Sequence, residues 1–323
     1  MMLTREELMR EAAASGFQPE PLEKAIHLLE LLEALRSHPF LKDRVALKGG
    51  TALNVFLFDL PRLSVDIDLN YIGAVDRDTM LEERPKVEQA VQAACSRLGI
   101  QIRRVPSEHA GGKWRLSFTG VSGRPSTLEL DMNFMYRTPL WPPVAMSSRR
   151  LGSFGASQVP VLDAHELAAG KLSALFDRRA SRDLFDAQQL LRKGNLDREL
   201  LRLGFVVYGG ASRRDWRTLS IEDIQVDPTE VDRQLWPVLR AGHVPPRDEL
   251  GRWGESLVAD CRELASALIP FEENEIEFLT RLNDEGEITP EHLTDDKRLR
   301  EVIRSHPGLR WKALNVRKHR GKG

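Results

Sequence analysis

The stretch that decides the fold covers residues 47–70 and reads LKGGTALNVFLFDLPRLSVDIDLN. It holds a Gly-Gly pair, a short apolar run, and then Ser64, Asp66 and Asp68 at a spacing of two. Side chains two positions apart point to the same face of a β-strand, so these polar residues are predicted to share one face. Neighbouring carboxylates without a basic partner repel each other. A divalent cation relieves that repulsion, and Mg²⁺ prefers hard oxygen ligands with positions left open for phosphate.

The glycine pair favours a nucleotide and metal site over the plainer interpretation, in which S-x-D-x-D is the solvated face of an exposed strand. Gly49 and Gly50 allow a backbone to approach phosphate groups closely. Thr51 opens an apolar run typical of a helix start, where backbone amides attract an anion. The same glycines are also compatible with a simple strand-to-helix turn. The combination of turn, helix and acidic strand is more specific than any one part.

This stretch resembles the first motif of the AbiEii/AbiGii toxin family, GG-T-A-L followed by R-x-S-x-D-x-D. Three further blocks are similar to family sequences: ELAAGKLSAL from Glu166, RDLFD from Arg182, and HPGLRWKALN from His306. The residues that match the first motif are Lys48, Gly49, Gly50, Thr51, Ala52, Leu53, Arg62, Ser64, Asp66, Ile67 and Asp68. The family consists of nucleotidyltransferase-like members of the DNA polymerase β superfamily and includes the MenT toxins.

The resemblance implies an α+β fold with a polymerase-β-like nucleotidyltransferase core and a mixed sheet. Changes in pattern along the chain indicate the same division. After helices near residues 5 and 22–36, the glycine turn and the acidic strand, a helix is expected over 76–98 and strands over 99–134. We therefore expect a core domain over residues 1–158 and a mainly helical domain over residues 159–323.

Composition sets only broad limits on function. The chain has 323 residues, of which 41% are hydrophobic, enough for a sizeable core. Lys+Arg 47 against Asp+Glu 48 neither demands nor excludes a nucleic-acid partner, because a local basic patch binds phosphate on a neutral protein. Cys95 and Cys261 form no metal or redox spacing. No signal peptide or membrane-spanning run is apparent, so a cytoplasmic location is expected.

A third carboxylate candidate lies in the segment TLELDMNF. Asp131 alternates with Leu130 and Met132, as expected for a strand that could pair beside the Asp66 strand. Two cations in nucleotidyl transfer commonly share carboxylates from adjacent strands. Asp66, Asp68 and Asp131 are therefore the predicted metal ligands, although a solvated strand face explains Asp131 equally well.

The helix that follows Asp163 carries Lys171 among apolar neighbours. Such a lysine either extends its ammonium to the surface or contacts a charged ligand. If the helix runs on unbroken, Asp186 shares a face with Lys171 better than Asp183 does, whereas a break near the arginines removes this argument. The resemblance assigns catalytic roles to Lys171 and Asp186, alongside Asp66 and Asp68, and places Lys171 at the triphosphate.

Arg62 and Ser64 complete the predicted nucleotide site, with Gly49, Gly50 and Thr51. Arg62 is suited to a phosphate contact, although it could simply pair with Asp59. Ser64 could bond a phosphate oxygen or the nucleotide base. The resemblance also makes Ser64 a candidate for modification, because antitoxins of related systems phosphorylate the equivalent serine.

The chain has three basic clusters, two of them interleaved with tryptophan, a pattern that suits RNA contact as well as an ordinary solvated surface. They are Arg178, Arg179 and Arg182; Arg213, Arg214 and Arg217 around Trp216; and Arg310, Lys312, Arg317, Lys318, Arg320 and Lys322 after or beside Trp311.

The sequence thus predicts a nucleotidyltransferase toxin of a toxin–antitoxin or phage-defence pair. We expect NTP as substrate, Mg²⁺ as cofactor with Mn²⁺ as an alternative, a cognate antitoxin as partner, and tRNA or another RNA as acceptor. Two other functions stay open: nucleotidyl transfer to a small molecule, and nucleotide-dependent regulation without turnover.

Overall fold

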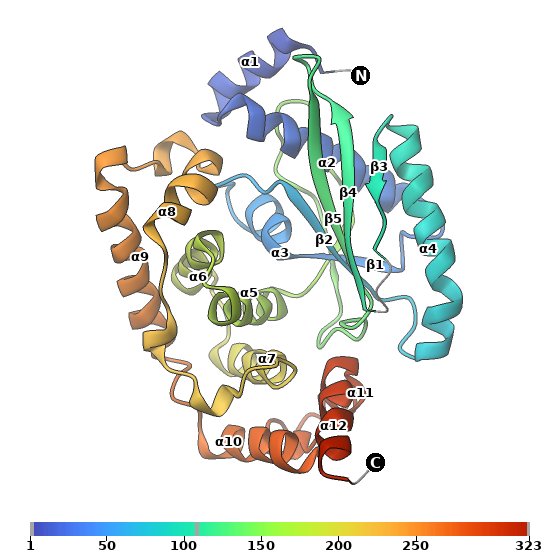
Figure 1. The fold of residues 1–323 in the computed structure, drawn as a ribbon, viewed down its shortest axis with the longest axis vertical. Coiled ribbons are helices and arrows are strands. Elements are labelled where there is room, and N and C mark those ends of the chain that lie inside the picture. Colours follow the sequence, from blue (N-terminus) through green and yellow to red (C-terminus); the bar gives the residue numbers. More distant parts are fainter. Residues whose placement is uncertain (1–2, 107–109, 322–323) are drawn as a thin grey trace. The chain divides into compact units, whose positions relative to one another are not determined.

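A computed structural model describes residues 3–106 and 110–321. The chain forms two compact units, each assembled from separate segments. The first unit contains residues 1–137, 143–162 and 235–244; the second contains residues 138–142, 163–234 and 245–323. Figure 1 shows the fold and labels the α-helices and the strands β1 to β5 with the names used below.

The first unit is built on a seven-stranded mixed sheet with the order β3-β4-β5-β2-β1-β7-β6. The β2–β5 and β1–β7 pairs are parallel, and the other neighbouring pairs are antiparallel. The strands are β1 Val45–Lys48, β2 Asp66–Tyr71, β3 Gln101–Arg104, β4 Gly111–Thr119, β5 Pro125–Asn133, β6 Val144–Met146 and β7 Val159–Val161.

The first unit also contains helices, two of which pack on this sheet. The helical segments are α1 Arg5–Ser15, α2 Pro19–Ser37, α3 Gly49–Thr51 continuing as η1 Ala52–Leu57, and α4 Arg77–Arg97. Helix α2 packs against β2, β5 and β7, while α4 packs against β3. Every second side chain of the central strands is buried, including Ile67, Leu69 and Leu130. The alternating faces expected for these strands are therefore present, and the polar residues occupy the other face.

Two local signals in the sequence are reproduced at helix starts. Thr4 and Glu7 form the capping box that begins α1. Asp163 caps the helix that follows it by accepting a hydrogen bond from the His165 amide.

The acidic strand is shorter than expected, because it begins at Asp66 rather than at Ser64. The backbone just before it is held by a segment distant in sequence. Arg62 forms an isolated antiparallel bridge with Leu239, and the Leu63 amide donates to the Val238 carbonyl at 2.8 Å. These bonds hold the backbone before Asp66 to residues 235–244 instead of to the sheet.

The second unit is helical. Its longer helices are α5 Ala164–Arg178, α6 Ser181–Lys193, α7 Arg198–Gly210, α9 Leu250–Ala265, α10 Glu273–Thr280, α11 Lys297–Ser305 and α12 Pro307–His319. Short helical segments join them: η2 Trp216–Thr218, η3 Ile221–Asp223, α8 Pro228–Glu230, η4 Val231–Leu235, η7 Arg247–Glu249, η8 Arg281–Glu285 and η9 Pro290–His292. Two further short helices, η5 Trp236–Val238 and η6 Ala241–His243, belong to the first unit. A mixed sheet followed by a mainly helical region confirms the α+β class.

Aromatic side chains form part of the core of the second unit. Trp216 is fully buried against Phe205, with ring centroids 4.6 Å apart, and also contacts Phe176 and Phe271. Base stacking on Trp216 is therefore a wrong interpretation of its basic neighbourhood, because this indole belongs to the interior.

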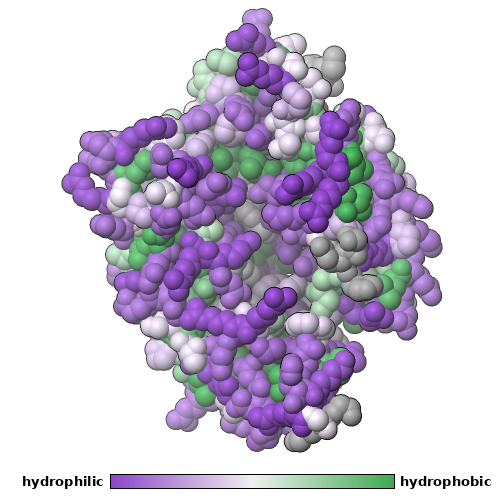
Figure 2. All heavy atoms as spheres, in the orientation of Figure 1, coloured by the Kyte–Doolittle hydropathy of each residue, from purple (hydrophilic) through white to green (hydrophobic). Residues whose placement is uncertain are grey.

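Hydrophilic residues cover most of the face drawn in Figure 2. The large hydrophobic side chains exposed in the described residues are Met9, Val75, Leu98, Val105, Val144, Trp311 and Leu314. Within the described part of the chain, no helix is both long and apolar enough to cross a membrane.

Candidate active site

The polar face of the sheet gathers charged residues from four strands. Residues paired directly across neighbouring strands point to the same face. One row of the register joins Lys48, Asp68, Asp131 and Lys113, and the adjacent row joins Asp66, Glu129 and Arg115. We call these seven residues the acid face. Asp131 thus lies beside Asp68, as the alternation in its strand predicted, whereas Lys113 and Glu129 were missed as members because their strand partners are not evident from sequence.

The glycine turn fits closely against one carboxylate of the acid face. Gly49 follows β1 with φ +71°, a conformation that L side chains rarely adopt. A Cβ atom at this position would lie 2.1 Å from Asp68 Oδ2. This position therefore requires glycine for two reasons: its backbone conformation, and the space that the Asp68 carboxylate fills.

The helix that starts at this turn is fixed to the acidic strand by a hydrogen bond from a buried threonine. The Thr51 hydroxyl donates to the Asp66 carbonyl oxygen at 2.5 Å, and Thr51 is fully buried. One turn later, the Asn54 side-chain amide donates to the Gly50 carbonyl at 3.0 Å. The helix begins at Gly49, earlier than the expected start at Thr51, so Thr51 holds the turn and the strand together instead of capping the helix.

Lys113 supplies positive charge to the acid face. Its Nζ lies 2.7 Å from Glu129 Oε2. The hydrogen bond to Glu129 raises the pKa of Lys113, partial burial opposes that shift, and the negative charges of Glu129, Asp66 and Asp131 reinforce it. The ammonium therefore lies within the electrostatic field of the predicted metal ligands.

The carboxylates have the chemistry of a divalent-cation site, since they are hard oxygen donors on neighbouring strands. Gly49 leaves room for the Asp68 carboxylate at the edge of the turn. Among the described residues, however, no group of three or more His, Cys, Asp or Glu side chains is close enough to hold a metal ion. The donor type fits such a cation, while a three-carboxylate cage is not assembled.

Arg62 and Ser64 lie just before the acidic strand, and both are buried. Arg62 is 2% exposed and donates from Nη1 to the Leu63 carbonyl at 2.8 Å. Asp59 pairs with Arg149 at 3.2 Å. Arg62 thus contributes to the packing of the segment before β2, and its contact with phosphate stays a prediction, as does the role of Ser64.

In the helical unit, Lys171 lies in a buried cluster of charges. Its Nζ is 2.7 Å from Asp183 Oδ1 and 3.0 Å from Asp186 Oδ2. The lysine is 8% exposed and Asp186 is fully buried, so the ammonium does not extend to the surface. Arg178 adds a second cation, with Nη2 at 3.0 Å from Asp183 Oδ2.

This cluster depends on a break between two helices. Helix α5 ends at Arg178, Arg179 adopts a left-handed conformation with φ 55°, and α6 begins at Ser181. The helix is therefore not continuous, and the face-sharing argument that favoured Asp186 over Asp183 does not apply. The reversal of direction brings both aspartates to Lys171, and Asp183 is the nearer.

The basic clusters are largely neutralised by acidic neighbours. Arg179 lies 3.7 Å from Asp223, and Arg214 lies 2.6 Å from the other oxygen of the same carboxylate. Arg217 pairs with both Asp215 and Asp284. A run of arginines in the sequence therefore overstates the positive charge that is available to a ligand.

A buried carboxyl group that the sequence did not single out lies on α5. Glu166 Oε1 accepts a hydrogen bond from the Tyr208 hydroxyl at 2.9 Å, and Oε2 accepts one from the Leu140 amide at 3.0 Å. Burial raises the pKa of Glu166 to about 7, against the opposing effect of these hydrogen bonds. Glu166 links α5, α7 and residues 138–142, which is a structural role.

The candidate site thus consists of a glycine turn and acidic strands in the first unit and a charged cluster in the helical unit. The family model described as "Nucleotidyl transferase AbiEii toxin, Type IV TA system" matches residues 30–255. The chain belongs to the AbiEii nucleotidyltransferase toxin family. It is accordingly a nucleotidyltransferase, with an NTP as substrate and, as is general for such enzymes, a divalent metal. Membership of a toxin family implies a cognate antitoxin.

The AbiEii fold extends beyond the matched residues. MenT4, a nucleotidyltransferase toxin from Mycobacterium tuberculosis H37Rv, is similar in structure with a TM-score of 0.59 and 19% sequence identity. The match covers 96% of this chain and 100% of MenT4. A search of curated protein sequences gave no match.

Proposed function

We propose that the protein is a Mg²⁺-dependent nucleotidyltransferase toxin that transfers a nucleoside monophosphate from an NTP to RNA, with tRNA as the acceptor. The observation that carries the proposal is the acid face beside the glycine turn. It brings Asp66, Asp68 and Asp131 to adjacent strands, with Gly49 packed against the Asp68 carboxylate. Its proposed biological setting is a toxin–antitoxin or phage-defence pair.

The acid face would hold the cation through Asp66 and Asp68, and Asp131 on the adjacent strand would become a third ligand if the bound cation draws the carboxylates together. A bound Mg²⁺ would neutralise charge on the transferred phosphoryl group and on the departing pyrophosphate. The backbone of the turn at Gly49 and Gly50 would approach the phosphates on the side that the Asp68 carboxylate does not fill. Thr51 keeps that turn in place through its bond to the Asp66 carbonyl.

For the helical unit, the proposal is that Lys171 and Asp186 take part in the transfer. Lys171 has a compact ammonium that suits a triphosphate, and its two aspartate partners hold it in a fixed position. Because the cluster is buried, removing either partner also leaves an uncompensated charge. Stability and activity must therefore be measured separately for variants at these positions.

RNA is the proposed acceptor on two grounds. The family that this chain resembles includes the MenT toxins. That resemblance implies transfer to the 3′ end of tRNA. The helical unit in addition exposes positively charged residues on α12 and directly after it, including Arg310, Lys318 and Arg320. A polyanionic acceptor suits such residues better than a small neutral molecule does.

The test incubates the purified protein with total RNA, total protein and a small-molecule extract, each with every α-labelled NTP in turn. We expect label on RNA in the tRNA size range. Asp66→Asn and Lys171→Met should reduce the rate at least about a hundredfold, because losing about 3 kcal/mol of transition-state stabilisation has that effect. Asp43→Asn is the matched control, since Asp43 is an exposed carboxylate outside the acid face.

Label on a small molecule alone would show that the acceptor is a small molecule and not RNA, and it would agree with the enzyme class. No label on any acceptor would favour nucleotide-dependent regulation without turnover. A folded Lys171→Met variant with the wild-type rate would remove Lys171 from the proposed machinery, and its free energy of unfolding, measured in urea, shows whether it is folded.

A further inference from the structure

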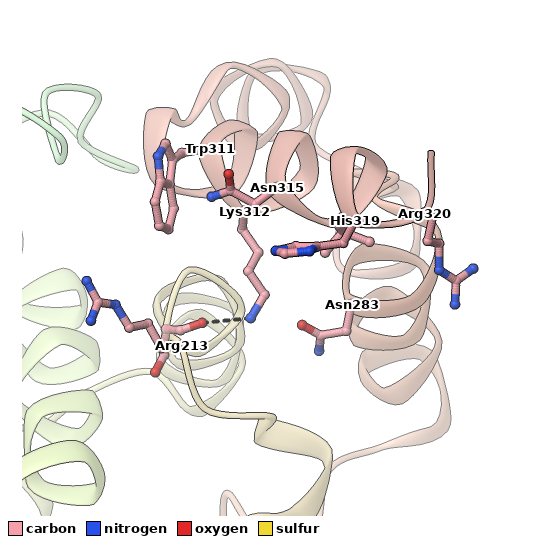
Figure 3. Close-up of a pocket in the computed structure, with 9 residues that line it drawn as sticks. Arg213, Asn283, Trp311, Lys312, Asn315, His319 and Arg320 are labelled. Atoms are coloured by element: carbon pink, nitrogen blue, oxygen red, sulfur yellow. Dashed lines mark hydrogen bonds between the residues drawn. The ribbon is translucent and has the colours of Figure 1, made fainter. Parts of the chain in front are cut away.

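A pocket in the helical unit is lined by one face of α12. Trp311, Asn315 and His319 are spaced four residues apart, and so are Lys312, Val316 and Arg320, so these residues lie along one side of the helix and its C-terminal end. The other walls come from Ser212 and Arg213, in the turn after α7, and from Asn283 in η8. Figure 3 shows these side chains around the pocket, which has a volume of about 510 Å³.

The walls of the pocket are fixed to one another. Lys312 Nζ donates to the Ser212 carbonyl at 2.9 Å, so α12 is tied to the turn after α7. Arg317 donates to the Gly286 carbonyl at 2.9 Å, which ties α12 to the end of η8. Arg217 pairs with Asp284, next to Asn283. The pocket is therefore formed by elements already in place, which reduces the ordering that a ligand must impose.

The pocket carries positive charge that the protein does not use internally. None of its nine lining residues is acidic. Arg213 and Arg320 form no ion pair with any residue that the structure describes, whereas the neighbouring Arg214 and Arg217 do. Asp284 lies close enough for Arg320 to lower its pKa, but its carboxylate is already bonded to Arg217. Two guanidinium groups are thus available to an anion.

The pocket also offers a flat aromatic surface and amide groups. Trp311 is 49% exposed, unlike the fully buried Trp216. Figure 3 shows the Trp311 indole, the Asn315 amide and the Arg213 guanidinium toward one end of the pocket, with Asn283 further along and Arg320 at the opposite end. An indole stacks on a nucleobase, an arginine binds phosphate, and an asparagine amide can bond a base edge as donor or acceptor.

We infer that this pocket binds an unpaired nucleotide of the RNA acceptor, with its base on Trp311 and its phosphate at Arg213, which lies at the same end of the pocket. The inference rests on the RNA acceptor of the proposed function. An unpaired nucleotide is required because bases within a duplex are stacked on each other and do not present a free face to the indole. A volume of about 510 Å³ falls within the usual range for a small-ligand pocket.

The test measures binding of a fluorophore-labelled single-stranded RNA to the full-length protein without NTP, with the same RNA in a duplex for comparison. Trp311→Ala should weaken single-strand binding at least about tenfold, and Trp311→Phe should stay within about threefold of wild type, since stacking tolerates another aromatic ring. Leu314→Ala is the matched control, because Leu314 is also exposed on α12 but does not line the pocket.

The charge contribution is tested by the salt dependence of binding. Arg213→Ala should reduce the slope of log affinity against log salt by about 0.7, the value for one phosphate of a single strand. Arg298→Ala, an exposed arginine of α11 outside the pocket, should change it less. This comparison keeps the inference testable even if Trp311→Ala does not fold.

Equal RNA affinity of wild type, Trp311→Ala and Arg213→Ala, with label transfer to RNA intact, would overturn the pocket and leave the proposed function standing. Single-strand binding that depends on Trp311, with no label transferred to RNA, would support the pocket and contradict RNA as the acceptor. Equal affinity for single strand and duplex would overturn the requirement for an unpaired nucleotide.

Discussion

At the scale of single residues, the sequence identified the glycine turn and the two aspartates but not how closely they fit. Gly49 was predicted to permit approach of a phosphate, whereas the structure shows the Asp68 carboxylate already packed against its Cα. The difference arises because a contact between β1 and β2 depends on strand register, which short motifs do not specify. Lys171 shows the same limit: its partners became clear only once the helix break was known.

Replacement of Gly49 by alanine should therefore be more damaging than strain in the backbone alone. The new Cβ would meet Asp68 Oδ2 at 2.1 Å, so the carboxylate or the turn must move. Gly99→Ala is the matched control, because its φ of +68° is nearly the same and nothing lies within 4 Å of the added atom.

We expect Gly99→Ala to lower the free energy of unfolding by about 1 kcal/mol and to leave nucleotidyl transfer unchanged. Gly49→Ala should lower it by a further 1 kcal/mol or more and reduce transfer at least about tenfold. Urea unfolding and the label assay measure the two effects. Equal loss of stability in both variants, with full activity in Gly49→Ala, would contradict the close fit at Asp68.

At the scale of elements, periodicity and capping signals located most helices and strands within a few residues. They did not reveal how the elements are held together, because the hydrogen bonds that join the elements are made between residues distant in sequence. Residues 235–244 join the first unit by bonds to the backbone before β2, although the surrounding sequence belongs to the helical unit. Glu166 likewise joins α5 to α7 and to residues 138–142.

The buried carboxyl group of Glu166 should make the stability of the protein depend on pH. Burial raises the pKa of Glu166 from 4.5 to about 7 in the folded state. Between these values the folded state holds more protons than the unfolded state, so this group lowers stability as pH rises. A pKa shift of this size contributes about 3 kcal/mol to the free energy of unfolding at low pH, and this contribution is fully lost above pH 7.

Glu166→Gln removes that titration and keeps an oxygen acceptor for the backbone amides. The free energy of unfolding of wild type minus that of Glu166→Gln should fall by about 3 kcal/mol between pH 4 and pH 8. Glu255→Gln, an exposed glutamate of α9, should give a nearly constant difference. A constant difference for Glu166→Gln as well would contradict the raised pKa.

At the scale of the whole molecule, the family resemblance and the pattern of elements together predicted an α+β nucleotidyltransferase, and family membership confirms the class. Charge in the sequence was a poorer guide. Arginine runs near 178 and 214 are mostly paired with acids, while the pocket on α12 keeps two arginines unpaired among the described residues. Pairing depends on tertiary neighbours, so it cannot be counted from composition.

The central claim is that the acid face holds a divalent cation together with the NTP. Calorimetric titration of each NTP, with and without Mg²⁺, tests it most directly. Wild type and Asp43→Asn should bind an NTP in a Mg²⁺-dependent manner, and Asp66→Asn should bind it at least about tenfold more weakly, a loss of about 1.4 kcal/mol. Equal heats and affinities for wild type and Asp66→Asn would contradict the claim.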